Sequence, residues 1–409
     1  MNLLIISISY LISRLQSSIL NIITMASGIM LITILLLGGY QIQEKLTNDA
    51  KGIDTVIGAK GSPLQLVLSS IYHIDIPTGN INEKDYHNIS KHPLVKKAIP
   101  ISLGDNYQNF RIIGTEHSYL KHFKASLKNG KIWQNNMEVI LGYEVAKSTK
   151  LKIGDKFFGN HGLIEGGEIH DDKEYLIVGV LEKNNNILDK LIITSTASIW
   201  HIHNHHDEHK NHHNNNHDKQ KSNHSETPKE ITAILINFKN KMAMMSFPRH
   251  INKNSNLLAA SPAFEISRLI KIIGIGKDSI ILFASFLIII SLCSILISML
   301  NSVHQRRYDL AIFRTLGASR KKIFLIVITE GMIITIIGSL LGIIFGHLLI
   351  EIIATYSSNN RNLGIRGFIF IPQILILWFA NLILCFAICL IPAIKAYKTD
   401  IKEMLTHVQ

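Results

Sequence analysis

Residues 279–322 read SIILFASFLIIISLCSILISMLNSVHQRRYDLAIFRTLGASRKK, and this stretch decides the fold class. It carries no charged side chain from residue 279 to 303, whereas its second half is strongly basic. A helix that crosses the hydrocarbon core of a bilayer needs about 20 consecutive apolar residues. The stretch therefore predicts a membrane-spanning helix over residues 278–300, followed by a basic loop over residues 301–322.

Three further apolar stretches are long enough to cross a bilayer. They predict spans over residues 17–40, 323–350 and 370–394, which makes the chain an α-helical membrane protein with four transmembrane helices. The first stretch lacks the basic leader and the small-residue cleavage site of a signal peptide, so we expect it to stay in the chain. Residues 1–16, apolar with scattered serines, are expected to form a cytoplasmic or interfacial helix.

Positive charge in short loops predicts the orientation of the spans. The loop at residues 301–322 carries six basic residues against one acid, Asp309, and the tail at residues 395–409 carries three lysines before residue 403. Both segments are therefore expected in the cytoplasm, with both termini inside. Residues 41–277 and the short loop at 351–369 are then expected outside an inner membrane.

Residues 41–277 predict one soluble module of mixed α+β type. Runs of β-branched and apolar residues near Gly or Asn predict strands at 110–115, 138–141, 175–181, 190–194 and 231–238. Residues 142–150 predict a short helix, and Gly154 with Asp155 predicts a turn into another strand. No helical period extends over a longer part of the module.

Sequence motifs for nucleotide chemistry are missing from the chain. No GxxxxGK[ST] phosphate-binding loop occurs. The nearest match, Gly58 to Ser62, lacks the spacing and predicts a glycine-rich turn before Pro63. No nucleophile elbow or paired-acid signature occurs either. The net charge of +12 is partly explained by the cytoplasmic loops, so we expect a non-catalytic membrane subunit that binds no nucleic acid.

A histidine-rich segment interrupts the module. Residues 201–224 read HIHNHHDEHKNHHNNNHDKQKSNH and hold almost no apolar side chain, which predicts a disordered loop. Neutral imidazole binds Zn²⁺ and also suits Ni²⁺ and Cu²⁺. The candidate ligands are His201, His203, His205, His206, His209, His212, His213, His217 and His224. A solvated linker without a metal role is the alternative.

The basic loop contains a short amphipathic pattern. Leu310, Phe313 and Leu316 recur at helical spacing, Gly317 is a plausible helix stop, and Ser319 could cap the next helix. On physical grounds such a helix could lie on anionic lipid or dock a protein, and the pattern leaves both open. Further along, Glu330 lies near the cytoplasmic end of the third span, where we expect it either to snorkel toward the membrane surface or to pair with a basic residue.

Three stretches resemble the FtsX-like, MacB-type family of ABC transporter permeases. MEVILGYEVAKSTKLKIGDKF (137–157) with YLIVGVLEKNNNILDKLIIT (175–194) is similar to the extracytoplasmic domain of that family. RRYDLAIFRTLGASRKKIFLIVITEG (306–331) resembles its cytoplasmic loop, and LIPAIKAYKTDIKEML (390–405) resembles its closing span and tail. The histidine-rich segment is not part of the family pattern.

The resemblance implies a permease that forms a homodimer or pairs with a second permease. It also implies a separate ATPase that holds the ATP, and movement of the extracytoplasmic domain driven by that ATPase. The coupling residues would be Leu310, Phe313, Arg314, Leu316, Gly317 and Arg320. No cofactor is expected in the chain beyond Zn²⁺ in the histidine-rich loop. Two alternatives remain open: a metal-sensing or metal-accepting membrane protein, and a scaffold that activates an extracytoplasmic enzyme.

Overall fold

The computed structural model describes residues 3–160, 169–202, 229–306, 312–360 and 366–398. The chain forms two compact units: a membrane unit, Met1–Gln43 with Ile272–Gln409, and a module, Glu44–Lys271. The module was expected at residues 41–277, so its expected ends lie three and six residues outside the compact unit. Two long helices, α2 (Leu15–Asp49) and α9 (Pro262–Gln305), run through these boundaries.

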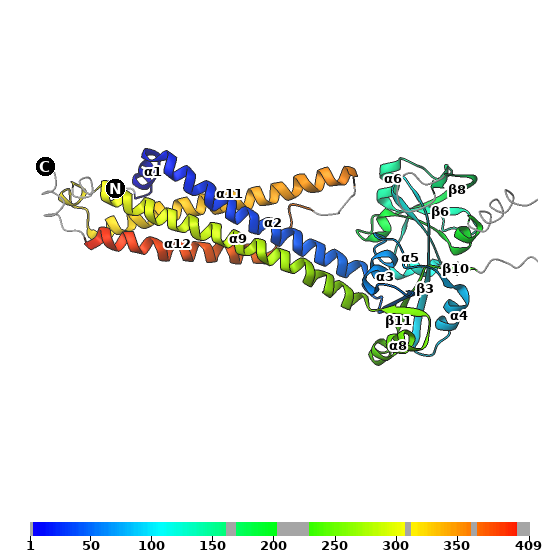
Figure 1. The fold of residues 1–409 in the computed structure, drawn as a ribbon. Helices are drawn as coiled ribbons and strands as arrows, with labels where there is room; N and C mark the ends of the chain where they lie inside the picture. The colour runs from blue at the N-terminus through cyan, green and yellow to red at the C-terminus, as the bar shows by residue number, and fades with distance from the viewer. Residues whose placement is uncertain (1–2, 161–168, 203–228, 307–311, 361–365, 399–409) are drawn as a thin grey trace, which may run out of the picture. The chain divides into compact units, whose positions relative to one another are not determined.

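Within the described residues, four helices are long and apolar enough to cross a membrane: α2, α9, α11 (Arg320–Asn360) and α12 (Pro372–Lys398). These four contain the predicted apolar stretches, except that α12 begins two residues late. Residues 351–360 were expected in a loop but continue α11, because they contain no glycine or proline that would end the helix. In Figure 1, α1 (Leu3–Ser13), the end of α9 and the start of α11 lie at the same end of the bundle.

Glycines on α11 allow this helix to approach α2 closely. Gly338, Gly342 and Gly346 recur every four residues, so they share one face of α11. A Cβ atom at Gly342 would lie 2.6 Å from the carbonyl oxygen of Ala26, and one at Gly346 would lie 2.8 Å from the Cβ atom of Thr33. Small residues at this spacing are a common contact between helices in lipid. We call this face of α11 the glycine stripe.

The module is built on one mixed sheet of ten strands. The strand order is β12-β1-β11-β3-β4-β9-β6-β8-β5, and β7 pairs with both β3 and β8. The β4–β9 and β6–β8 pairs are parallel, whereas the other neighbours are antiparallel. The strands are β1 (Thr55–Ala59), β3 (Val95–Tyr107), β4 (Phe110–Thr115), β5 (Leu127–Gly130), β6 (Glu138–Leu141), β7 (Lys156–Asn160), β8 (Ile169–Leu181), β9 (Leu191–Ser195), β11 (Ala233–Phe238) and β12 (Leu257–Ala260).

Short helices and one small extra sheet complete the module. The helices are α3 (Pro63–Ser70), α4 (Glu83–Ser90), α5 (His117–His122), α6 (Tyr143–Thr149), the 3₁₀ turn η1 (Ile187–Lys190) and α8 (Lys241–Asn254). A separate pair is formed by β2 (Ile81–Asn82) and β10 (Glu230–Ile231). Apolar clusters fill the space between the sheet and these helices, for example Val56, Ile101 and Ile113 with Tyr119. The mixed α+β class is therefore confirmed.

The predicted strands agree with the structure, with small shifts at their ends. The strands at 110–115 and 138–141 have the predicted bounds, whereas the predicted 231–238 strand is divided between β10 and β11. The helix at 142–150 forms as α6, with Gly142 and Lys150 as its caps. Two expectations were wrong: α8 is a helix of 14 residues where no long helical period was expected, and Gly58 lies inside β1 rather than in a turn.

A buried histidine should make the module sensitive to acid. His73 is 6% exposed, and its Nε2 atom lies 3.4 Å from the hydroxyl oxygen of Tyr119. Burial, and secondarily the positive charge of Arg111, lowers the pKa of His73 from 6.5 to about 3. Between these values the unfolded chain binds a proton that the folded module does not bind. His73 alone should therefore lower the free energy of unfolding by about 1.4 kcal/mol per pH unit as the pH drops below about 6, whereas Asp49, whose pKa burial raises from 3.8 to about 6, contributes in the opposite sense.

Thermal unfolding of the full chain between pH 4 and pH 7 measures this slope. In a Trp378→Phe background, the remaining tryptophans, Trp133 and Trp200, both report on the module. His73→Asn should remove the His73 contribution and change the slope by about 1.4 kcal/mol per pH unit toward greater stability in acid, because asparagine tolerates the left-handed backbone at this position (φ 52°) and does not titrate. The control is His87→Asn, whose side chain is 55% exposed. An unchanged slope in His73→Asn would contradict the assignment.

Candidate coupling site

The basic loop ends in a turn of defined geometry. Residues 312–315 are helical, and Gly317 adopts a left-handed backbone with φ of 95°. The Ala318 N–H donates to the Phe313 carbonyl (2.9 Å), and the Gly317 N–H donates to the Arg314 carbonyl (3.1 Å). These two bonds are the pair that ends a helix in the Schellman arrangement, so Gly317 is the helix stop that the sequence predicted. We call residues 312–319 the coupling turn.

The start of α11 follows this turn without a break. Ser319 holds the N-cap position, where its carbonyl accepts hydrogen bonds from the N–H groups of Lys322 (3.0 Å) and Ile323 (3.4 Å). The amide groups on both sides of Gly317 are thus engaged in hydrogen bonds. The end of the short helix and the start of α11 are thus each closed by backbone hydrogen bonds.

The side chains of the coupling turn divide between the bundle and the surface. Phe313 packs against the apolar core of the bundle, and Arg314 is half-buried. Leu316 is 79% exposed, and Arg320 is also exposed, as are Lys321 and Lys322 after it. Leu310 lies outside the described residues, so the described part of the amphipathic helix is a single turn. An exposed leucine beside three cations remains on the surface.

Arg306, at the end of α9, joins three helices next to the coupling turn. Its Nη1 atom lies 3.5 Å from Glu330 Oε2 on α11, and its Nη2 atom donates to the carbonyl of Tyr10 on α1 (3.2 Å). The guanidinium carbon also lies 3.7 Å from the centre of the Tyr10 ring. Both charged side chains are only 10% exposed. A planar cation with several donors suits such a junction better than a lysine would.

The pairing expected for Glu330 is confirmed, but its partner is Arg306, 24 residues earlier in the chain. Among the basic residues closer in sequence to Glu330, Arg307 lies outside the described residues, and the others lie on the coupling turn and at the exposed start of α11. The sequence indicated an ion pair, because a single acid such as Glu330 in an apolar helix needs a counter-charge. The choice among the basic residues depended on how α9 and α11 pack, which the local sequence does not specify.

The helix expected in residues 1–16 forms as α1, and it packs against α11. Ser7 is fully buried, and its hydroxyl lies 2.7 Å from that of Thr329 and donates to the carbonyl of Ile326 (3.4 Å). The sequence did not predict this contact, because scattered serines occur both in an apolar helix that packs against another helix and in one that contacts only lipid. Through Arg306 and Ser7, α1 is tied to the two helices that flank the coupling turn.

The histidine-rich segment has one described candidate ligand, at its start. His201 is exposed, and its carbonyl accepts a hydrogen bond from Lys173 Nζ (2.5 Å). The other eight candidates, from His203 to His224, lie outside the described residues. Within the described ranges, no group of three or more His, Cys, Asp or Glu side chains could hold a metal ion.

Two family models match the chain. The MacB-like periplasmic core domain matches residues 18–239, more than half of the chain, and the FtsX-like permease C-terminal region matches residues 281–401. The chain belongs to the FtsX-like, MacB-type permease family. Permeases of this family are non-catalytic membrane subunits of ABC-type transporters that work with a separate ATPase. The coupling turn lies within the matched FtsX-like region.

Solved structures similar to this permease come from extracytoplasmic domains. The periplasmic region of MacB from Actinobacillus actinomycetemcomitans is 11% identical, with a TM-score of 0.34, over 56% of this chain and 98% of that chain. The extracellular domain of the noncanonic ABC-type transporter YknZ from Gram-positive bacteria is 12% identical, with a TM-score of 0.29, over 51% of this chain and 100% of that chain. A search of curated proteins found no match.

Proposed function

We propose that this permease couples ATP hydrolysis by a separate cytoplasmic ATPase to movement of its module on the other side of an inner membrane. Family membership supports the role of permease subunit. The observation that carries the coupling proposal is the coupling turn, whose hydrogen-bonded backbone presents an exposed leucine directly before the three exposed cations at the start of α11. The basic charge of this region also supports a cytoplasmic location for the turn and for both termini.

The turn has the features of a protein-docking element. A rigid backbone lowers the entropy that docking would otherwise cost, and an exposed large apolar side chain offers the kind of anchor that dominates binding energy. The Arg306 junction links α1, α9 and α11, and α11 follows the turn directly in the chain, so we propose that a displacement of the turn is transmitted through α11 to all three helices. We propose that the permease works as a dimer, as the resemblance implies, with one ATPase on each copy.

Leu316→Asp should reduce copurification of the ATPase by about 30-fold, because losing a central anchor commonly costs about 2 kcal/mol. Charge reversal at Arg320 should weaken the association further at low salt. The matched control is Met242→Asp in the module, where the replaced side chain is 81% exposed. The ratio of ATPase to permease after affinity purification measures the effect. Retention of the ATPase by Leu316→Asp would contradict the docking role of the turn.

We propose in addition that the histidine-rich segment collects Zn²⁺ or a similar ion with modest affinity. Nine histidines in residues 201–224 support this, since neutral imidazoles are the main soft ligands of a module without cysteine. Replacing the nine histidines with asparagine should abolish zinc uptake by the full chain in calorimetry. Uptake by the natural chain should fade below about pH 6, where protons compete for the imidazoles. Equal uptake by both chains would rule the proposal out.

A further inference from the structure

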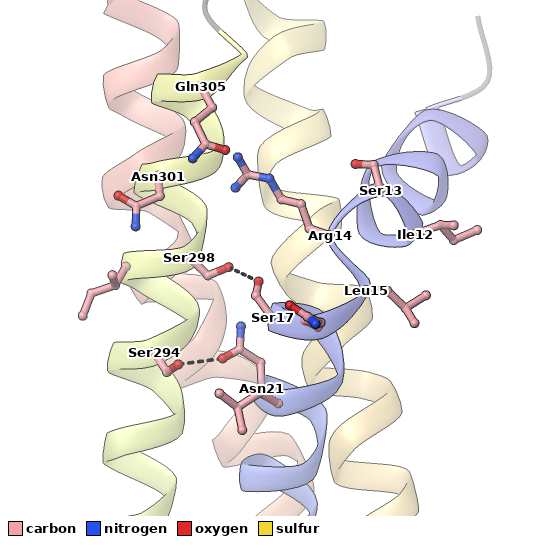
Figure 2. Close-up of a pocket in the computed structure, with 13 residues that line it drawn as sticks. Ile12, Ser13, Arg14, Leu15, Ser17, Asn21, Ser294, Ser298, Asn301 and Gln305 are labelled. Carbon is pink, nitrogen blue, oxygen red and sulfur yellow. Dashed lines mark hydrogen bonds between the residues drawn. The ribbon is translucent and has the colours of Figure 1, made fainter.

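A polar groove lies on the membrane unit at the junction between α1 and α2. Its cavity volume is about 680 Å³, within the size range of small-ligand sites. Polar side chains of α9 form one wall, and Figure 2 shows the facing wall formed by the α1–α2 junction. The polar lining residues that matter here are Arg14, Ser17, Asn21, Ser298, Asn301 and Gln305. We call this cavity the α1–α2 groove.

The only charged side chain that lines the described groove is a cation. Arg14 is the single residue between α1 and α2, and Figure 2 shows its guanidinium pointing across the groove toward Gln305 on α9. Arg14 is half-buried and makes no direct ion pair with a residue of the described ranges; its charge acts on Glu330, which Arg306 already pairs, so the three side chains together carry one positive charge in excess. A half-buried cation beside the start of a membrane helix is stabilised by a nearby negative charge. The groove therefore favours an anionic occupant.

A buried amide adds a second hydrogen-bond donor. Asn21 is 1% exposed, and its Oδ1 atom accepts a hydrogen bond from the Ser294 hydroxyl (2.7 Å). Its Nδ2 atom has no partner among the described residues, and Figure 2 shows it directed toward the pair formed by Ser17 and Ser298. An unsatisfied amide costs several kcal/mol at a membrane helix. An acceptor oxygen in the groove would remove this cost.

Exposed apolar side chains flank the polar lining. Leu15 is 54% exposed, and Leu20 and Ile297 are each 59% exposed. An occupant with an anionic, acceptor-rich end and an apolar remainder fits both features. We propose that the α1–α2 groove binds the phosphate headgroup of an anionic phospholipid, with its acyl chains against the apolar flanks. A second copy of the chain fits less well, because the chain carries a net charge of +12 and would bring more positive charge.

The same phosphate chemistry could come from a soluble anion, so the test separates the two sources. The full chain in mild detergent is stripped of lipid and titrated with phosphatidylglycerol, phosphatidylcholine or inorganic phosphate, and native mass spectrometry counts the bound molecules. We expect retention of phosphatidylglycerol over phosphatidylcholine and no displacement by inorganic phosphate. Arg14→Gln should lower phosphatidylglycerol binding at least fivefold, which corresponds to about 1 kcal/mol per cation near an anionic lipid surface.

Matched variants keep the proposal falsifiable. Arg14→Lys should retain most of the binding, because it keeps the charge, whereas Asn21→Val should lose part of it. Lys398→Gln removes one exposed cation at the end of α12 and should leave the binding unchanged. Equal binding of both lipids, displacement by inorganic phosphate, or an unaffected Arg14→Gln variant would each overturn the proposal. Disulfide cross-linking of two copies through Asn301→Cys in place of lipid binding would assign the groove to a second copy instead.

Discussion

Arg306→Ala is expected to destabilise the membrane unit by about 3–5 kcal/mol. The substitution leaves Glu330 buried without its counter-charge, and removal of one partner of a buried pair is far more costly than replacement of both. It also removes the guanidinium from the Tyr10 ring and the bond to the Tyr10 carbonyl, so α1 should loosen. Thermal unfolding in nanodiscs measures the stability, and proteolysis near residue 10 measures the loosening of α1.

Two comparisons separate the buried pair from an ordinary surface pair. The double variant Arg306→Met with Glu330→Leu should recover much of the lost stability, because no buried charge remains. Lys156→Ala breaks the exposed ion pair with Glu174 (2.7 Å) and should change the stability by less than about 1 kcal/mol. The buried pair does not stabilise the junction if Arg306→Ala unfolds at the same temperature as the natural chain. The same conclusion follows if the double variant is less stable than either single variant.

Under the proposed coupling role, Arg306→Ala is expected to impair transmission rather than docking. The coupling turn keeps its own hydrogen bonds in Arg306→Ala, since Gly317 and Ala318 donate only to carbonyls within the turn. The ATPase should therefore still copurify with this variant, whereas its hydrolysis should no longer respond to the permease. Leu316→Asp should have the opposite pattern, with an intact bundle and no ATPase bound.

Local sequence signals predicted the elements whose causes are local. The apolar stretches predicted the four membrane helices because length and hydropathy are sufficient for that assignment. The strands at 110–115 and 138–141 had the expected bounds because both are buried runs of β-branched residues beside turn residues. Gly317 could be assigned as a helix stop because a left-handed residue at that position favours glycine.

Elements that depend on distant partners were missed. Strand β3 contains two lysines, Pro100 and Gly104, so its own propensity opposes a strand, and it forms because β11 and β4 pair with its two edges. The Arg306 junction depends in the same way on three helices far apart in sequence. The glycine stripe also contacts a distant helix, but unlike the Arg306 junction its spacing can be read directly from residues 338–346, GSLLGIIFG. It was missed because a hydropathy profile does not detect the spacing of glycines.

Gly342→Ala is expected to separate α2 from α11 and to destabilise the bundle by about 1–3 kcal/mol, and Gly342→Leu by more. The added Cβ atom would lie 2.6 Å from the Ala26 carbonyl oxygen and 2.8 Å from Ile29 Cβ, and neither atom is the free end of a flexible side chain. In lipid, helices associate through such close packing rather than through the hydrophobic effect. When the two helices are forced apart here, no other driving force replaces the packing between them.

Gly38→Ala is the matched control, because it lies on α2 and an added Cβ atom there meets nothing within 4 Å. Alanine is favoured over glycine inside a helix by up to about 1 kcal/mol, so this variant should be neutral or slightly more stable. The same substitution is thus expected to act with opposite signs at two positions of one bundle. Thermal unfolding of both variants in nanodiscs decides the matter. If Gly342→Ala is as stable as Gly38→Ala, α2 and α11 do not meet at the glycine stripe.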